Sequence, residues 1–369
     1  MSEWREFRLG DISCLEYGKM PKQKLIGNGN YITFSGYKYL DIYPDYNCEE
    51  GDVIVVARGV GGTGDVKLVK QKCYLTNLSI KISLNNFIVD NSFFYYFFKK
   101  DNLRYLDSGS AQSQITIKDL SDERFNFPPL PEQKAIAGVL SSLDDKIDLL
   151  HRQNKTLEAM AEALFRQWFV EEAEEGWEEI ELGDVIETTS GGTPSRKNMT
   201  FFENGTIHWV KSKELNGTFI FDTEEMISEN ALKSSSAKML PENSILIAMY
   251  GATVGEYAII SKPMACNQAV CALKPSDDYP YTYLFLLIKH NKEELINMAV
   301  GSAQQNISQQ LIKKIPIWDC TERIKQFHLN TFTYFEKIKT NQCQIHNLEK
   351  LRDSLLPKLM SGEVRIKGV

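Results

Sequence analysis

The sequence lacks the features of membrane, secreted and metal-binding proteins. Its longest apolar runs are short, such as residues 93–98 and 284–288, so no segment approaches the length of a membrane span. The N-terminal residues are charged and include no apolar stretch like that of a signal peptide. The 7 cysteines are odd in number and form no CxxC pair, which disfavours a disulfide framework and a zinc site. These absences predict a cytoplasmic protein that needs no membrane, metal or cofactor.

The sequence is also poor in catalytic motifs. It contains neither Asn-Pro-Pro-Tyr nor Asp-Pro-Pro-Tyr, the motifs of amino-group DNA methyltransferases. The glycine-rich stretch 59–64 does not match the GxxxxGK[ST] phosphate loop and is typical of a turn between strands. Residues 132–134 have the Glu-x-Lys of many nucleases, but the only upstream Pro-Asp, at 44–45, is far away. Glu132 directly follows Pro131, where an acidic first helical turn is expected. The 5 histidines show no ligand spacing, so we predict no catalytic residue.

What the sequence does contain is an ordinary globular composition with an acidic balance. Hydrophobic residues make up 43% and charged residues 25% of the 369 positions, which suits two or three domains with cores of their own. The net charge of −7 argues against a protein that is basic throughout. Nucleic-acid binding is still allowed, because it requires a local positive patch and not a positive total.

A series of landmarks recurs in the two halves of the chain in the same order. The offset between partners drifts only from 173 to 192 residues, which favours a tandem duplication over a coincidence of common residues. The matched pairs are Leu-Gly-Asp at 9–11 and 182–184, an apolar strand with a glycine-bearing turn at 51–66 and 243–258, and Gly-Ser-Ala-Gln at 109–112 and 301–304. We therefore expect the order domain, helix, domain, helix.

The first long helix is predicted over residues 132–171. This stretch has no proline, and its apolar positions alternate in steps of four and three, the heptad pattern of a coiled coil. The positions assigned to pairing include Leu140, Leu143, Ile147, Leu150, Asn154 and Leu157. A helix of this length would extend roughly 60 Å, more than a globular domain usually needs for its own core.

The second long helix is predicted from Glu322 onward, with a less regular seam. The positions assigned to pairing include Tyr334, Ile338, Asn341, Ile345, Leu348 and Leu355. Pro357 is expected to kink or end the helix, and Gly362 to close its last turn.

The two helices are expected to pair with each other in antiparallel orientation. Residues 132–176 hold 5 basic and 10 acidic side chains, a net charge of −5, whereas residues 322–369 hold 9 and 5, a net charge of +4. Opposite charges favour this pairing over self-pairing. The antiparallel alignment places Asn154 opposite Asn341, and we predict that this pair sets the register of the coil. The alternative is that each helix packs only on its own domain.

Basic and polar side chains gather in loops at matching points of both halves. Residues 17–40 include no acidic residue, and loops that combine lysine, arginine, tyrosine and asparagine with glycine suit contacts to phosphates and base edges. The candidate DNA-binding residues are Lys19, Lys22, Lys24, Lys38, Arg58, Gln112, Arg196, Lys197, Lys211, Lys213, Tyr250 and Gln304. The alternative for any one of these cations is an ordinary solvated surface position. Gln112 and Gln304 are identical in both halves, so a shared structural or phosphate-contacting role fits them better than discrimination between sequences.

Several motifs together resemble one protein family. The segment PPLPEQKAIAGVLSSLDDKIDLL after the first domain, and LEKLRDSLLPKLMSGEVRI at the C-terminal end, resemble the conserved regions of the specificity (S) subunits of type I restriction–modification systems. TSGGTPSRKN and GSAQQNIS resemble the target recognition domains of the same family. This resemblance covers nearly the whole chain.

The resemblance implies a DNA reader without catalytic activity of its own. It implies an α+β fold with two tandem, β-rich target recognition domains at 1–131 and 176–321. Two long antiparallel coiled-coil helices, at 132–175 and 322–369, would complete a pseudo-twofold repeat. Each domain would read half of a bipartite site in double-stranded DNA, and the helices would dock two methyltransferase (M) subunits that carry S-adenosylmethionine. Restriction (R) subunits would add ATP-driven cleavage. The alternatives are a self-contained DNA enzyme with a degenerate catalytic centre and a scaffold without a DNA role.

Overall fold

The chain folds into two compact units that share the long helices. The computed structural model describes residues 4–36, 38–59, 62–100, 102–107, 113–174, 176–300 and 306–366. One unit comprises Met1–Ile147 with Asn347–Val369, and the other comprises Asp148–His346. Each unit therefore contains part of both long helices. The division into four segments at residues 131, 175 and 321 stays a prediction.

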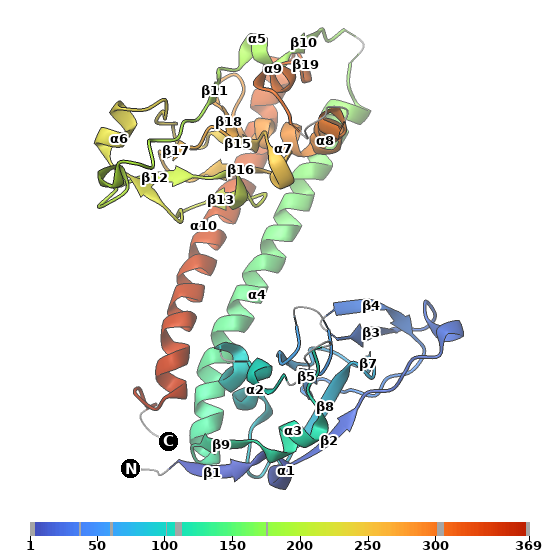
Figure 1. Ribbon diagram of the computed structural model, residues 1–369. Helices are drawn as coiled ribbons and strands as arrows, with labels where there is room; N and C mark the ends of the chain where they lie inside the picture. Colours follow the sequence, from blue (N-terminus) through green and yellow to red (C-terminus); the bar gives the residue numbers. More distant parts are fainter. Residues whose placement is uncertain are drawn as a thin grey trace. The chain divides into compact units, whose positions relative to one another are not determined.

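The first unit is built from short strands and helices (Figure 1). Its strands are β1 (Arg5–Arg8), β2 (Ser13–Tyr17), β3 (Tyr31–Ser35), β4 (Lys38–Tyr43), β5 (Val53–Val56), β6 (Val66–Leu68), β7 (Cys73–Leu75), β8 (Ser79–Leu84) and β9 (Arg124–Phe127). Its short helices are α1 (Leu9–Ile12), η1 (Gln23–Leu25), α2 (Asn91–Lys100), η2 (Leu103–Leu106) and α3 (Ile117–Asp122). The strands form an antiparallel sheet in the order β2-β8-β5-β6, a sheet in the order β4-β3-β7 and the pair β1-β9.

Strand β5 occupies the centre of this unit. All four of its residues, Val-Ile-Val-Val, are buried. Val53 and Val55 pack into the cluster that contains the phenylalanines of α2, whereas Ile54 and Val56 pack against the sheet β4-β3-β7. Successive side chains of a strand point to opposite faces, so a strand covered on both faces requires an unbroken apolar run. This explains why β5 has no alternating polar residue.

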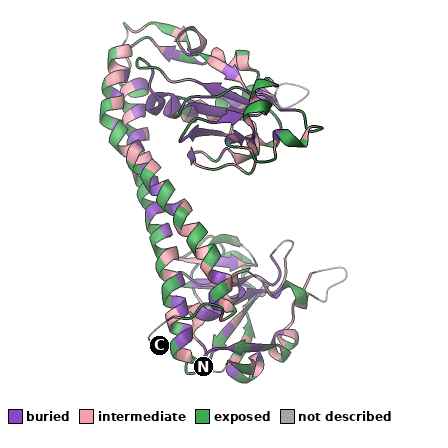
Figure 2. Cartoon of the chain, turned by 90° about the vertical axis from the view of Figure 1, so that its left-hand side faces the viewer, coloured by how far each residue is buried: buried purple, intermediate pink, exposed green. Residues whose placement is uncertain are grey.

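The second unit repeats this plan. Its strands are β10 (Glu179–Glu181), β11 (Thr188–Ser190), β12 (Ile207–Val210), β13 (Phe219–Ile220), β14 (Met226–Ile227), β15 (Ile245–Ala248), β16 (Tyr257–Ile260), β17 (Ala265–Cys266), β18 (Val270–Leu273) and β19 (Pro316–Trp318). Its shorter helices are α5 (Leu182–Val185), η4 (Met199–Phe201), η5 (Ser212–Glu214), α6 (Glu229–Lys233), η6 (Gly251–Thr253), α7 (Tyr281–His290), α8 (Lys292–Val300) and α9 (Gln309–Lys313). The sheets run β11-β18-β15-β16-β13 and β14-β12-β17, beside the pair β10-β19. Figure 2 shows its central strands as buried.

The strand orders confirm the internal duplication. The order β2-β8-β5-β6 matches β11-β18-β15-β16, and β4-β3-β7 matches β14-β12-β17, with β13 as the one addition to the described part of the second unit. Two glycines show the same constraint. A Cβ on Gly18 would lie 2.3 Å from the carbonyl oxygen of Thr76, and a Cβ on Gly191 would lie 2.2 Å from that of Cys266. In both units the chain passes too close to a neighbouring backbone for any other residue.

The two long helices are α4 (Leu130–Arg166), continued by the π-helical turn η3 (Gln167–Glu171), and α10 (Thr321–Met360). They are antiparallel. In the second unit Asn154 meets Asn341, and further along α4 Phe165 meets Phe327 at a ring-centroid distance of 6.0 Å, so the numbering rises on one helix as it falls on the other. With the duplicated domains, these helices confirm the predicted α+β class.

Two details of α10 refine the sequence-based expectation. Pro357 does not end the helix, which continues to Met360 before Gly362, at φ +74°, closes it. Tyr334, which the heptad pattern assigned to the seam, is partly buried against the core. Its neighbour Phe335 is also buried, because it packs on Tyr281 of α7 at a ring-centroid distance of 5.7 Å. In the second unit, α10 therefore packs both on α4 and on its own domain, which combines the two alternatives.

The pairing positions of the helices are mostly buried. Leu140, Ile147, Leu150, Asn154, Ile338, Asn341 and Ile345 are buried, whereas Leu143, Leu157 and Leu348 are partly exposed. Of the helices formed by the described residues, none combines the length and the apolar character needed to cross a membrane.

Candidate nucleic-acid interface

The first unit presents three lysines in the loop between β2 and β3. Lys19, Lys22 and Lys24 are exposed, and none of them has an acidic partner within ion-pair distance among the described residues. Met20 lies among them and is 75% exposed. Lys38, the first residue of β4, belongs to the same predicted group, but its side chain lies outside the described residues. The loop offers positive charge without compensation, which is what a phosphate contact requires.

Arg58 and Tyr250 stand at equivalent strand ends in the two units. Arg58 follows β5 and forms an isolated β-bridge with Gln114, and Tyr250 follows β15 and forms one with Asn306. The Nε atom of Arg58 is buried and has no hydrogen-bond partner within the described part of the chain. The side chain of Tyr250 is exposed. Arg58 is partly exposed as a residue, so the equivalent strand ends of the two units carry side chains of different chemistry and exposure.

The Gly-Ser-Ala-Gln elements, with Gln112 and Gln304, lie outside the described residues. The residues that follow them are described. Ile115 and Ile307 are fully buried, and each donates its N–H at 2.9 Å to the carbonyl of the residue just before the strand-end position of its own unit. The segments after the two elements are thus anchored in the same way, which is what a shared structural role requires.

Three of the four predicted cations of the second unit, Arg196, Lys211 and Lys213, are held in an ion-pair network. The Nζ atom of Lys211 lies 2.9 Å from Oε2 of Glu224 and 2.8 Å from Oε1 of Glu225. The Nζ atom of Lys213 lies 2.6 Å from Glu224, and Nη1 of Arg196 lies 2.5 Å from Glu225. Glu224 and Glu225 therefore form ion pairs with Arg196, Lys211 and Lys213, and the DNA-binding role of these cations stays a prediction.

The pKa values of the network follow from these contacts. Hydrogen bonds from Arg196 and then Lys211 lower the pKa of Glu225 to about 2. Hydrogen bonds from Lys211 and Lys213 also lower the pKa of Glu224. Burial lowers the pKa of Lys211, but hydrogen bonds to both glutamates outweigh this effect and raise it. All of these groups are therefore charged at neutral pH, and the carboxylates offset the positive charge.

Arg196 is also held over two aromatic rings. Its guanidinium carbon lies 4.4 Å from the ring centroid of Phe202 and 5.3 Å from that of Trp209, which is cation–π geometry. Lys197 next to it is exposed, and no ion pair joins it to another residue of the described chain.

Sequence reasoning missed Glu224 and Glu225 because a search for basic loops passes over acidic residues. Their position follows from strand pairing. Strands β12 and β14 are antiparallel with Ile207 opposite Ile227, so the two glutamates that precede β14 lie beside the residues that follow β12. A pairing register between strands this far apart leaves no local signal in the sequence.

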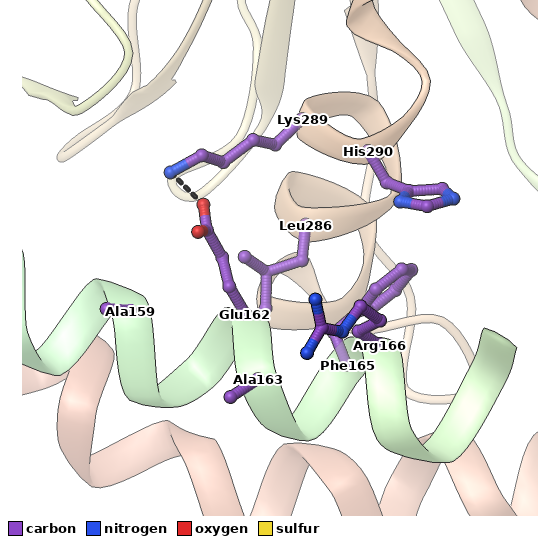
Figure 3. Close-up of a pocket in the computed structure, with 8 residues that line it drawn as sticks. All are labelled: Ala159, Glu162, Ala163, Phe165, Arg166, Leu286, Lys289 and His290. Atoms are coloured by element: carbon purple, nitrogen blue, oxygen red, sulfur yellow. Dashed lines mark ion pairs between the residues drawn. The ribbon is translucent and has the colours of Figure 1, made fainter. Parts of the chain in front are cut away.

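A cavity in the second unit lies between α4 and α7 (Figure 3). It has a volume of about 380 Å³, with Leu286 and Phe165 among its apolar walls. Lys289 lines it and forms ion pairs with Glu158 and Glu162. The described residues contain no group of three potential metal ligands. The cavity is a gap where a helix packs on its domain, lined by satisfied charges.

Comparison with known proteins agrees with the repeated architecture. The family model described as "Type I restriction modification DNA specificity domain" matches residues 1–159 and 174–349. The MjaIX specificity subunit of a type I restriction enzyme from Methanocaldococcus jannaschii is 28% identical and covers 76% of this chain and 70% of its own. The HindI specificity subunit from Haemophilus influenzae is 26% identical and covers 99% of this chain and 100% of its own.

A solved structure shares the fold. The S subunit of a type I restriction–modification system from M. genitalium superposes with a TM-score of 0.74 at 19% identity, over 96% of each chain. The alternative of a self-contained DNA enzyme receives no support from these comparisons. The two family matches span most of both halves, and on this ground the chain belongs to the type I restriction–modification DNA specificity family.

Proposed function

We propose that the chain selects the DNA target of a type I restriction–modification enzyme without catalysing a reaction itself. Each recognition domain would read one half of a bipartite site in double-stranded DNA. The observation that carries the proposal is the duplication, in which two units share one strand order but present different side chains at equivalent loop positions. A shared scaffold with divergent loops suits a site whose halves differ in sequence.

Within this proposal, the side chains have different tasks. Lys19, Lys22 and Lys24 would contact phosphates and set the position of the duplex, because their charges are unpaired among the described residues. Arg58 and Tyr250 would face base edges from equivalent strand ends. Arginine can bond guanine with two hydrogen bonds, and tyrosine offers one hydroxyl, so these positions would contribute to the difference between half-sites.

The long helices would set the spacing of the half-sites and dock two methyltransferase subunits, to which restriction subunits would be added in a cleaving complex. Both helices carry apolar side chains on their outer faces. The exposed examples are Val139, Leu149 and Met160 on α4 and Leu329, Phe332 and Leu351 on α10. Exposed apolar residues on a helix that is already paired suit further helices from partner subunits.

The proposal is tested by purifying the chain with the methyltransferase subunit of its own system. Genomic DNA treated with the complex would be sequenced for methylated adenine. We expect methylation at a single bipartite sequence, and none with the methyltransferase subunit alone. Methylation at the same sites without this chain would contradict the proposal.

Replacement of Lys19, Lys22 and Lys24 by glutamine is expected to weaken DNA binding about ten- to a hundredfold at physiological salt. Each lost phosphate contact reduces the slope of log K against log salt by about 0.9, so the three together would flatten it by up to roughly 2.7. Fluorescence anisotropy over a series of KCl concentrations measures both quantities. The control replaces Lys67, Lys72 and Lys118, which carry the same charge elsewhere in the unit. An equal effect of the control would remove the loop from the interface.

A further inference from the structure

The two recognition domains differ in how their candidate phosphate contacts are compensated. The three loop lysines of the first unit have no acidic partner among the described residues. In the second unit Arg196, Lys211 and Lys213 are shared between Glu224 and Glu225, so three positive charges face two negative ones within 3 Å. The candidate cations of the two units are therefore compensated differently, and Arg196 is the one among these three that lies in the loop equivalent to that of Lys19, Lys22 and Lys24.

We propose that Glu224 and Glu225 compete with DNA phosphate for the cations of the second recognition domain and thereby suppress its binding to unrelated sequences. This inference rests on the proposed DNA-reading function. A duplex approaching this surface must displace carboxylates from the cations or place phosphates beside them. Either route costs free energy that favourable base contacts of a correct half-site can offset, whereas an incorrect sequence lacks those contacts.

The exposure of the cations allows such an exchange. The side chains of Arg196 and Lys213 are 54% and 59% exposed, so both can turn toward a phosphate. Lys211 is 15% exposed and bonds both glutamates, so it would retain them when the outer cations leave. The exchange requires no rearrangement of the core.

A third carboxylate, that of Glu214, connects the two backbone segments that carry this network. Glu214 accepts hydrogen bonds at 2.7 Å from the backbone N–H groups of both Lys211 and Glu224. These bonds join the end of β12 to the loop before β14. The competing carboxylates are thus positioned by backbone contacts that would persist when their ion pairs open.

Salt dependence distinguishes this exchange from ordinary phosphate binding. A free lysine that binds a phosphate displaces a condensed counterion from the DNA, which produces steep salt dependence. A lysine that leaves a carboxylate also leaves behind a negative charge that attracts cations. The second domain should therefore contribute less to the slope of log K against log salt than its number of cations predicts.

The test uses the complex of the full chain with its methyltransferase subunit and the variant E224Q/E225Q. Binding is measured on a duplex with the bipartite sequence that the complex methylates and on an unrelated duplex, across roughly 0.1–0.3 M KCl. We expect binding to the unrelated duplex to tighten about tenfold or more, with a slope steeper by about 2. Binding to the correct sequence should tighten less, so the ratio between the two should fall.

The control is E187Q/E229Q, which removes the same charge from ion pairs elsewhere in this unit. Glu187 pairs with Lys274 and Glu229 with Lys233. The inference is overturned if E224Q/E225Q leaves binding to the unrelated duplex unchanged, if the control tightens it equally, or if binding to the correct sequence is lost. If E224Q/E225Q does not fold, E224Q alone should show the same direction with a smaller change. A wild-type complex that binds both duplexes equally would instead refute the proposed function itself.

Discussion

Replacement of Asp144 by alanine is expected to destabilise the first unit by about 2–4 kcal/mol, because two cations would lose their common partner. Asp144 lies on α4 and accepts hydrogen bonds from Tyr96 at 2.9 Å, Lys99 at 2.7 Å and Arg352 at 2.8 Å. The side chains of Asp144 and Arg352 are 15% and 16% exposed. This carboxylate joins α2, α4 and α10. Urea unfolding measures the loss, and Asp145→Ala, an exposed neighbour on the same helix, should change stability by less than about 0.5 kcal/mol.

The pH dependence of the same site has a defined sign. Burial raises the pKa of Asp144, but hydrogen bonds from Lys99, Arg352 and Tyr96 outweigh burial and lower it. A lowered folded-state pKa means that the stabilisation is fully present above the ordinary aspartate value of about 3.9. It is lost as the pH falls through the lower folded-state pKa. The stability difference between the wild type and Asp144→Asn should therefore shrink in acid. A difference that grows as the pH falls would contradict this assignment.

Replacement of Asn341 by leucine is expected to destabilise the second unit by about 1–3 kcal/mol, whereas the double replacement with Asn154→Leu should restore or exceed wild-type stability. The Nδ2 atom of Asn341 donates to Oδ1 of Asn154 at 2.8 Å, and both side chains are buried. The single change leaves the amide of Asn154 buried without this partner. The double change buries two apolar side chains instead. Within the described part of the chain, Nδ2 of Asn154 and Oδ1 of Asn341 already lack partners, which limits what the pair contributes to stability.

A thermodynamic cycle over the two single variants and the double variant measures this coupling. Asn330→Leu, on an exposed position of the same helix, is the control and should have a small effect. The proposed role of the pair in setting the register predicts that spin labels on α4 and α10 give a broader distance distribution in the double variant. A loss in the double variant equal to the sum of the two single losses would show that the asparagines act independently. An unbroadened distribution would argue against a role in register.

The duplication and the long helices could be predicted from the sequence because their signals are local or periodic. Heptad spacing places Leu140, Ile147 and Leu150 on one helix face, and each of them is buried. The unbroken apolar run of β5 likewise indicates a strand covered on both faces. Of the two effects expected of Pro357, a kink or an end of the helix, the structure excludes the end, because the helix continues to Met360.

The candidate interface could be predicted only in part. The exposed lysines between β2 and β3 follow from a stretch without acidic residues. The ion pairing of Lys211 could not be predicted in this way, because it depends on glutamates that strand pairing brings beside the lysine. In the same way, Phe335 is buried beside Tyr334 because α7 packs there. Each of these outcomes involves a neighbour on another element.

The sequence by itself determined the repeated order of domain and helix, the strands and helices with strong periodicity, and the family. These properties depend on the spacing of residues along the chain, which the sequence gives directly. Only the tertiary structure decided which charges are compensated, as with Asp144 beside Arg352 and Glu225 beside Arg196. An ion pair depends on distances of a few ångströms between residues far apart in the chain, and packing and strand register set those distances.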